Sequence, residues 1–179
     1  TRVFSSAASD VYKRQAFLEA AARVKSGGGR IGFSLSDTFC VERHKPDFLD
    51  LFARDIGILL ANFAEAQALL DVTDMADIIA AMQNAGVDGA ITCGEEGAVI
   101  VRGDEAVRVA AHAVETVTDL TGAGDQFAAG YLCGVARGRS AQTCGRMGAL
   151  AAAEVIQHFG PRPEKDLRAV FAAHGFEIG

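Results

Sequence analysis

The sequence predicts an α/β fold with a mainly parallel sheet flanked by helices, and three observations lead to this fold class. Short apolar runs alternate along the chain with longer segments whose apolar residues recur at helical spacing. Half of the 179 residues are hydrophobic and 22% are charged, a balance typical of a globular protein. Strong turn signals, among them the triple glycine at residues 27–29, separate the segments. An alternation of strand and helix is the usual pattern of a parallel sheet.

Helices are predicted where apolar residues recur every three to four positions between capping signals. The first stops at the triple glycine, the second opens with Pro46 in its first turn, and the fourth ends at Gly86. We expect helices over residues 15–25, 46–54, 63–70, 74–84, 124–137, 141–158 and 163–173.

Strands are predicted from short apolar runs bounded by turn residues. Gly103-Asp104 is a hairpin turn signal between the last two runs. We expect strands over residues 30–36, 56–61, 89–93, 98–102 and 106–110. In such sheets ligands bind beyond the carboxyl ends of the strands, where loops enter helices.

The first fourteen residues differ from the rest, because they show no periodicity, no cap and no strand signal. They also resemble a translated adapter sequence, SSAASDVYKRQ, found at the ends of some proteins inferred from environmental sequence reads. We therefore expect residues 1–14 to be a non-native scar or disordered tail, and residues 15–179 to be one domain portion whose parent protein continues upstream.

The net charge and the cysteines indicate which binding partners and which cellular compartment to expect. The net charge of −6 argues against a nucleic-acid or anionic-membrane surface, and the longest apolar runs fall far short of the ~20 residues of a membrane span. The histidines show no zinc-binding spacing. The cysteines form no C-x-x-C pair, which favours buried reduced thiols in a cytoplasmic protein; they are Cys40, Cys93, Cys133 and Cys144.

The most informative stretch is Gly122-Ala123-Gly124-Asp125, at the expected junction of a strand and a long helix. Small residues let backbone amides approach a ligand, and a helix N-terminus carries about half a positive elementary charge. The turn could therefore hold an anion without a lysine. A carboxylate beside such a site repels phosphate, which favours Asp125 as the acceptor of a proton from an attacking hydroxyl. Alternatively, Asp125 only caps the helix and the glycines only turn the chain.

Two weaker motifs precede the Gly122–Asp125 stretch in the sequence. Asn62 and Glu65 form an N-x-x-E pattern after an expected strand, and Mg²⁺ prefers oxygen ligands such as the Glu65 carboxylate, often through water. The same tetrapeptide is also common at the start of a surface helix. Thr92, Gly94 and Gly97 form a T-x-G-x-x-G pattern, which by itself is also an ordinary strand–turn–strand.

Together, and in this order, the three motifs resemble those of the PfkB (ribokinase-like) family of carbohydrate and nucleoside kinases. Residues 119–125 match that family's D-T-[TN]-G-A-G-D pattern except at Leu120, where threonine is common. Residues 36–44 and 151–163 are similar to segments of the adenosine kinase-like branch. The resemblance implies a Rossmann-like, ribokinase-like fold and transfer of the ATP γ-phosphoryl group to a hydroxyl of a sugar or nucleoside.

The resemblance also implies roles for particular residues. Gly122, Ala123 and Gly124 would form the anion hole, and Asp125 would be the catalytic base. Glu65 would hold Mg²⁺ through water, and Asn62 would orient phosphate or water. The remaining roles are nucleotide contacts by Thr92, Gly94 and Gly97, a place for Gly160 beside the adenine base, and a monovalent-cation site such as K⁺ at Asp119.

Family members build the acceptor site largely from an N-terminal half with a G-G-x-x-x-N segment and a β-sheet lid. No such segment precedes Gln15. We therefore expect a chain truncated at its N-terminus, without the lid and inactive alone, whose full-length protein could form a homodimer. The alternative is a non-enzymatic module that binds a nucleotide or phosphometabolite and retains the fold.

Overall fold

The computed structural model describes residues 2–5 and 11–178, with side chains described from residue 19 onward. Within this part six strands form one sheet, and their hydrogen-bonded order is that of the chain. The strands are β1 (Arg2–Ser5), β2 (Ile31–Ser34), β3 (Ile58–Asn62), β4 (Asp88–Thr92), β5 (Ala98–Arg102) and β6 (Glu105–Val109). The helices are α1 (Val11–Ser26), α2 (Thr38–Arg54), α3 (Phe63–Leu70), α4 (Met75–Ala85), α5 (Ala123–Ala136), α6 (Ala141–Val155) and α7 (Leu167–Ala173), with a short 3₁₀ turn η1 (Gly94–Glu96).

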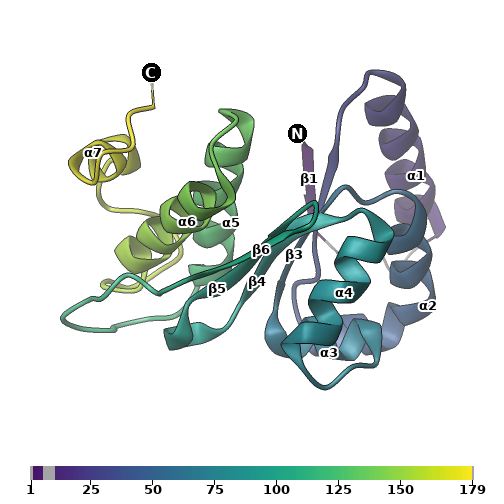
Figure 1. Cartoon of the computed structure of the whole chain (residues 1–179), viewed down its shortest axis with the longest axis horizontal. Coiled ribbons are helices and arrows are strands. Elements are labelled where there is room, and N and C mark those ends of the chain that lie inside the picture. Colours follow the sequence, from purple (N-terminus) through teal and green to yellow (C-terminus); the bar gives the residue numbers. More distant parts are fainter. Residues whose placement is uncertain (1, 6–10, 179) are drawn as a thin grey trace. The chain divides into compact units, whose positions relative to one another are not determined.

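The first of two compact units extends to Ile91 and also includes Val101–Ala106. In it β1, β2 and β3 are parallel, with Phe33 of β2 opposite Leu59 of β3. Both of these side chains are buried, as in parallel sheets that are covered on both faces. Helix α2 packs on α3, and α3 contacts α4 (Figure 1).

The second unit comprises Thr92–Ile100 and Val107–Gly179. Its helices α5 and α6 lie side by side (Figure 1), and glycines allow their close approach. A Cβ added to Gly130 of α5 would lie 2.4 Å from the Met147 carbonyl oxygen of α6. Helix α7 completes this unit, because Phe171 is buried against Met147 and Leu150.

The observed elements confirm the predicted α/β class, and most differ from the expected ranges only at their ends. The largest difference is α2, which begins at Thr38 rather than at Pro46. Asp37 caps its N-terminus by accepting a hydrogen bond from the Cys40 amide. His44 has non-helical backbone angles, so Pro46 lies just after a kink and begins the second half of the helix.

The C-terminal helices are also shorter than expected. Helix α6 ends at Val155 and not at His158. Helix α7 begins at Leu167 and not at Pro163. The Asp166 side chain caps it by accepting a hydrogen bond from the Arg168 amide.

Residues 1–14 carry no strand signal in the sequence, yet the structure places a strand among them. Strand β1 pairs with β2 in parallel register, Arg2 opposite Ile31, and α1 begins at Val11. A four-residue strand is too short to leave a periodic signal. Residues 1 and 6–10 of the expected tail lie outside the described residues. The assignment of residues 1–14 as non-native stays a prediction.

Across the described residues, no helix combines the length and apolar character needed to cross a membrane. All four cysteines lie in this part of the chain and none forms a disulfide. Only Cys144 is buried, and the other three are half-buried, so the expectation of buried thiols was correct for one cysteine of the four.

Candidate nucleotide site

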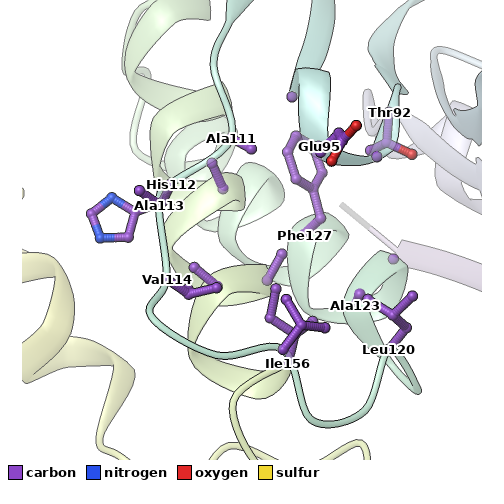
Figure 2. Close-up of a pocket in the computed structure, with 17 residues that line it drawn as sticks. Thr92, Glu95, Ala111, His112, Ala113, Val114, Leu120, Ala123, Phe127 and Ile156 are labelled. Carbon is purple, nitrogen blue, oxygen red and sulfur yellow. The ribbon is translucent and has the colours of Figure 1, made fainter.

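A pocket of about 670 Å³ in the second unit joins two of the three sequence motifs. Thr92, Gly94 and Gly97 line it from the turn after β4, and Ala123 and Gly124 line it from the start of α5. Figure 2 shows Thr92 and Glu95 at one side of this pocket, with Ala123 and Leu120 below them in the view. Residues that are about thirty positions apart in the sequence therefore meet at one site.

The wall of the pocket is mostly apolar. Figure 2 shows the Phe127 side chain of α5 near the middle of the view, with Val114 to its left and Ile156 below it. Leu120, which stands where the family commonly has threonine, also lines the pocket and is 68% exposed. An apolar wall with a few polar groups suits a flat ring system that carries a polar tail.

The start of α5 presents backbone amides. Gly122 is the N-cap, with a left-handed φ of 81° and no side-chain cap. The first helical bond runs from the Gln126 amide to the Gly122 carbonyl, so the amides of Gly124 and Asp125 precede it and have no partner inside the helix. The Ala123 amide donates to the Leu120 carbonyl over 3.2 Å. Gly124 and Asp125 therefore have amides that the helix does not use, and the anion hole expected from Gly122, Ala123 and Gly124 stays a prediction.

Asp125 lies in the first turn of α5 and is exposed. The partial positive charge of the helix N-terminus stabilises its carboxylate. The residues that line the pocket do not include Gly122 or Asp125. An exposed carboxylate next to available amides can receive a proton from a second molecule bound outside the pocket.

The strand expected over residues 106–110 is present as β6, but it does not lead directly into this turn. Strand β6 ends at Val109, and residues 110–120 form no strand or helix. Instead, the amides of Thr118 and Asp119 donate to the Ile156 carbonyl at the end of α6, over 2.7 and 3.3 Å. The turn is therefore positioned by α6 rather than by a sheet strand.

Asp119 connects the turn to the loop that contains Gly160. Its Oδ1 accepts from the Thr121 amide over 2.9 Å and its Oδ2 accepts from the Gly160 amide over 3.0 Å. The Gly160 amide, followed by the Thr121 hydrogen bonds, holds the pKa of Asp119 below its ordinary value. Both carboxylate oxygens are engaged by the protein, so the structure shows a bracing role for Asp119.

Gly160 itself does not line the pocket, although its loop lies against the Gly122 turn. The Gln126 side-chain amide donates to the Pro161 carbonyl over 3.2 Å. A Cβ at Gly122 would lie 2.6 Å from the Pro161 Cβ. The loop therefore supports the turn through Pro161.

Sequence reasoning missed a buried carboxylate that holds the same loop. Glu154 of α6 is 4% exposed, and its Oε1 accepts from the amides of Glu164 and Lys165 over 3.1 and 2.9 Å. The same oxygen lies 3.3 Å from His158 Nε2. A single carboxylate within the small-residue run of α6 was the signal that could have found it.

The N-x-x-E motif is a capping box in the first unit, at the end of β3. The Glu65 amide donates to Asn62 Oδ1, and Glu65 Oε2 accepts from the Asn62 amide over 2.9 Å. Glu65 Oε1 accepts from the Asn62 side-chain amide over 2.8 Å. Glu65 is only 6% exposed, whereas Asn62 and Ala64 at the same helix start are exposed, so only the carboxylate of the motif is buried. In the described part of the chain, no group of three or more His, Cys, Asp or Glu side chains is arranged to hold a metal.

The buried position of Glu65 predicts a pH dependence of stability. Burial, with a further contribution from the nearby Asp37 charge, raises the pKa of Glu65 above its ordinary value of 4.5, although the Asn62 amide opposes this shift. The folded chain therefore binds this proton more tightly than the unfolded chain. The stabilisation is complete below pH 4.5 and is lost as the pH rises through the raised pKa.

Replacing Glu65 with glutamine should remove this dependence. We expect the free energy of unfolding of the native chain, relative to Glu65→Gln, to fall with rising pH by at most about 1.4 kcal/mol per pH unit and then to level off. Urea denaturation between about pH 4 and pH 8 measures this difference. Glu105→Gln, at an exposed strand position, is the control. Parallel curves for the native chain and Glu65→Gln would contradict the prediction.

Comparison with known proteins decides the family. A family model described as pfkB family carbohydrate kinase matches residues 3–167. The chain belongs to this family. The resemblance carried by the three motifs is thereby confirmed, as is the ribokinase-like fold.

Solved structures and curated relatives of this PfkB-family chain include both sugar and nucleoside kinases. A probable sugar kinase of Rhizobium etli CFN 42 is 36% identical with a TM-score of 0.90, over 97% of this chain and 53% of that one. Adenosine kinase of Sinorhizobium meliloti is 39% identical with a TM-score of 0.89 and the same coverage. Cytidine kinase of Thermococcus kodakarensis is 30% identical over 74% of this chain and 49% of its own length. The chain thus spans about half the length of these proteins.

Proposed function

We propose that the protein transfers the γ-phosphoryl group of ATP to a hydroxyl of a sugar or nucleoside, and that this chain supplies the nucleotide-binding part. The observation that carries the proposal is the pocket in which the Thr92–Gly97 turn meets the first turn of α5. Its apolar wall suits the base of a nucleotide, and the Gly124 and Asp125 amides suit phosphate oxygens.

In the proposed reaction an acceptor hydroxyl attacks the γ-phosphorus atom. Its oxygen forms a new O–P bond while the bond to the bridging oxygen of ADP breaks, and the hydroxyl proton passes to the Asp125 carboxylate. The first-turn amides of α5 stabilise the negative charge on the phosphoryl oxygens. Asp125 is suited to this step because it is exposed and lies in the same turn as these amides.

Two carboxylates, Glu65 and Asp119, are the candidate ligands of the proposed cations. Mg²⁺ would neutralise charge on the nucleotide phosphates. The two oxygens of Glu65 each accept one hydrogen bond from Asn62 and retain a second lone pair, so they fit contact with a hydrated ion. Asp119 is proposed for K⁺ with less support, because both of its oxygens brace the turn.

Two classes of molecule, nucleosides and sugars, are the candidate acceptors of the phosphoryl group. Adenosine kinase and cytidine kinase among the relatives support a nucleoside, and the probable sugar kinase supports a sugar. A homodimer of the complete protein and a cytoplasmic location stay predictions.

Calorimetric titration of Mg·ATP into the 179-residue chain tests the nucleotide-binding proposal, with circular dichroism to verify folding. We expect saturable binding at one site that requires magnesium. A folded chain that releases no heat would contradict it. Turnover of ATP by the protein extended to the length of its relatives, with sugars and nucleosides as acceptors, then separates a kinase from a non-enzymatic nucleotide-binding module.

A further inference from the structure

A second cavity, of about 270 Å³, lies in the second unit and belongs to none of the sequence motifs. It is open to solvent and is bordered by the segment after β6, by α6 and by the end of α7. Four polar side chains face it, and these are His112, Gln142, Arg146 and His174.

The cavity differs in charge from the rest of the protein. The chain carries a net charge of −6, yet no aspartate or glutamate is among the described residues that line this cavity. Its lining instead holds one permanent cation, Arg146, and two imidazoles that can take up a proton. A local positive site on an acidic protein favours an anionic ligand over a cationic or neutral one.

The Arg146 guanidinium is held in place by an aromatic ring. Its central carbon lies 4.8 Å from the centroid of the Phe176 ring. Such a contact occupies the planar face of the guanidinium but leaves the N–H groups at its edge able to donate. An oriented fork of N–H donors matches the paired oxygens of a carboxylate or phosphate.

The two histidines form a pair beside this arginine. The ring centroids of His112 and His174 lie 5.1 Å apart in an edge-to-face arrangement. His174 Nδ1 lies 2.8 Å from the Val170 carbonyl oxygen, which can only accept, so Nδ1 carries a proton. Nε2 can donate to an oxyanion when the ring carries a second proton there. Figure 2 shows the His112 ring pointing away from the side chains that meet in the candidate nucleotide pocket.

We propose that this second cavity binds a small oxyanion, the phosphate or carboxylate group of a metabolite, through the Arg146 guanidinium and the His112 and His174 imidazoles. Gln142 supplies a side-chain amide that can donate to the same oxygens. Gln142, Arg146 and His174 do not line the nucleotide pocket, so the proposal is independent of the kinase reaction at these three residues.

Ala111, His112 and Ala149 line both cavities, so an anion in the nucleotide pocket could also affect His112. His174 lines only the second cavity and therefore distinguishes the two sites. His44 lies in the first unit and serves as an internal reference in the same spectrum.

The test is an NMR titration of the 179-residue chain, in which the imidazole C–H resonances are followed at constant pH and ionic strength. Inorganic phosphate and malonate are the two probes, and they distinguish a phosphate site from a carboxylate site. We expect saturable shifts of His112 and His174 with at least one probe, and little change at His44. Arg146→Gln should weaken binding about tenfold or more, because it removes charge-assisted hydrogen bonds.

Arg168→Gln is the matched control, because Arg168 is an exposed arginine of α7 that does not line the cavity. This variant should bind the probes as the native chain does. If Arg146→Gln fails the circular dichroism check, Arg146→Lys retains the charge without the fork and should still bind more weakly. Shifts that are equal at all four histidines, that do not saturate, or that saturate in the Arg146 variants at the same probe concentration as in the native chain would overturn the proposal, as would no shift at His174.

Discussion

Replacing Asp125 with asparagine should lower the turnover of phosphoryl transfer by about 100- to 10,000-fold, the range typical of general-base removal. Asparagine has nearly the same shape and can still lie in the first turn of α5, but it cannot receive the proton of the acceptor hydroxyl. Asp125 is not among the residues that line the nucleotide pocket, so the KM for ATP should change little. Steady-state kinetics of the complete protein that carries this chain measure both quantities.

The control for this variant is Asp77→Asn, because Asp77 is also an exposed acid in the first turn of a helix, α4. It should leave turnover unchanged. Near-normal turnover in Asp125→Asn would eliminate the catalytic role. A weakened affinity for ATP with unchanged turnover would instead assign Asp125 to the structure of the turn.

The elements that the sequence predicts best are those with capping signals inside the same few residues. Helix α3 begins after Asn62 and ends at Leu70, as expected, because its capping box is local to the motif. Helix α4 has Asp74 at its N-cap and Gly86 in a left-handed conformation at its C-cap, and Gly86 marks the end of this helix in the sequence. Local hydrogen bonds of this kind leave a local pattern in the sequence.

The parts that sequence reasoning missed depend on contacts between distant residues. Asp119 bonds the Gly160 amide across 41 positions, and Glu154 bonds two amides ten and eleven positions away. No rule of residue spacing predicts a hydrogen bond between residues so far apart in the sequence. The irregular segment between β6 and Gly122 was not predicted for the same reason, since it is held by the Ile156 carbonyl at the end of α6.

For the candidate site, the sequence supplied the motif residues but not the shape of the pocket. Thr92, Gly94 and Gly97 do meet Ala123 and Gly124, yet the apolar wall that makes the pocket comes largely from residues without a motif. Phe127, for example, follows helical spacing that predicts only a core position. Packing of this kind depends on how α5, α6 and the segment after β6 come together, which periodicity alone does not specify.

The two glycines of the T-x-G-x-x-G turn should respond very differently to substitution by alanine. Gly97 has φ 92° and ψ −127°, a backbone region that is essentially restricted to glycine. A Cβ at Gly97 would lie 2.0 Å from the Val109 carbonyl oxygen and 2.6 Å from the Ala111 amide nitrogen. Because these contacts are to backbone atoms, no side-chain rotation can relieve them.

Gly94 has φ 59°, but nothing lies within 4 Å of a Cβ added there. We therefore expect Gly94→Ala to cost only about 1–2 kcal/mol of the free energy of unfolding, from the left-handed backbone alone. Gly97→Ala adds to its backbone strain an overlap that must displace the end of β6, so it should cost about 3–5 kcal/mol. Urea denaturation followed by circular dichroism measures both.

The same displacement should reach the pocket, because Gly97 and Ala111 both line it. Gly97→Ala is therefore expected to lose Mg·ATP binding even at low temperature, where the chain is still folded. Gly94→Ala tests whether this glycine serves the turn or the ligand. Unchanged Mg·ATP binding would mean that Gly94 only forms the turn. Weaker binding by a stable variant would mean that the ligand needs the open space beside the Gly94 backbone. Equal destabilisation by the two substitutions would show that the Gly97 segment yields easily, and would contradict its role in fixing the pocket wall.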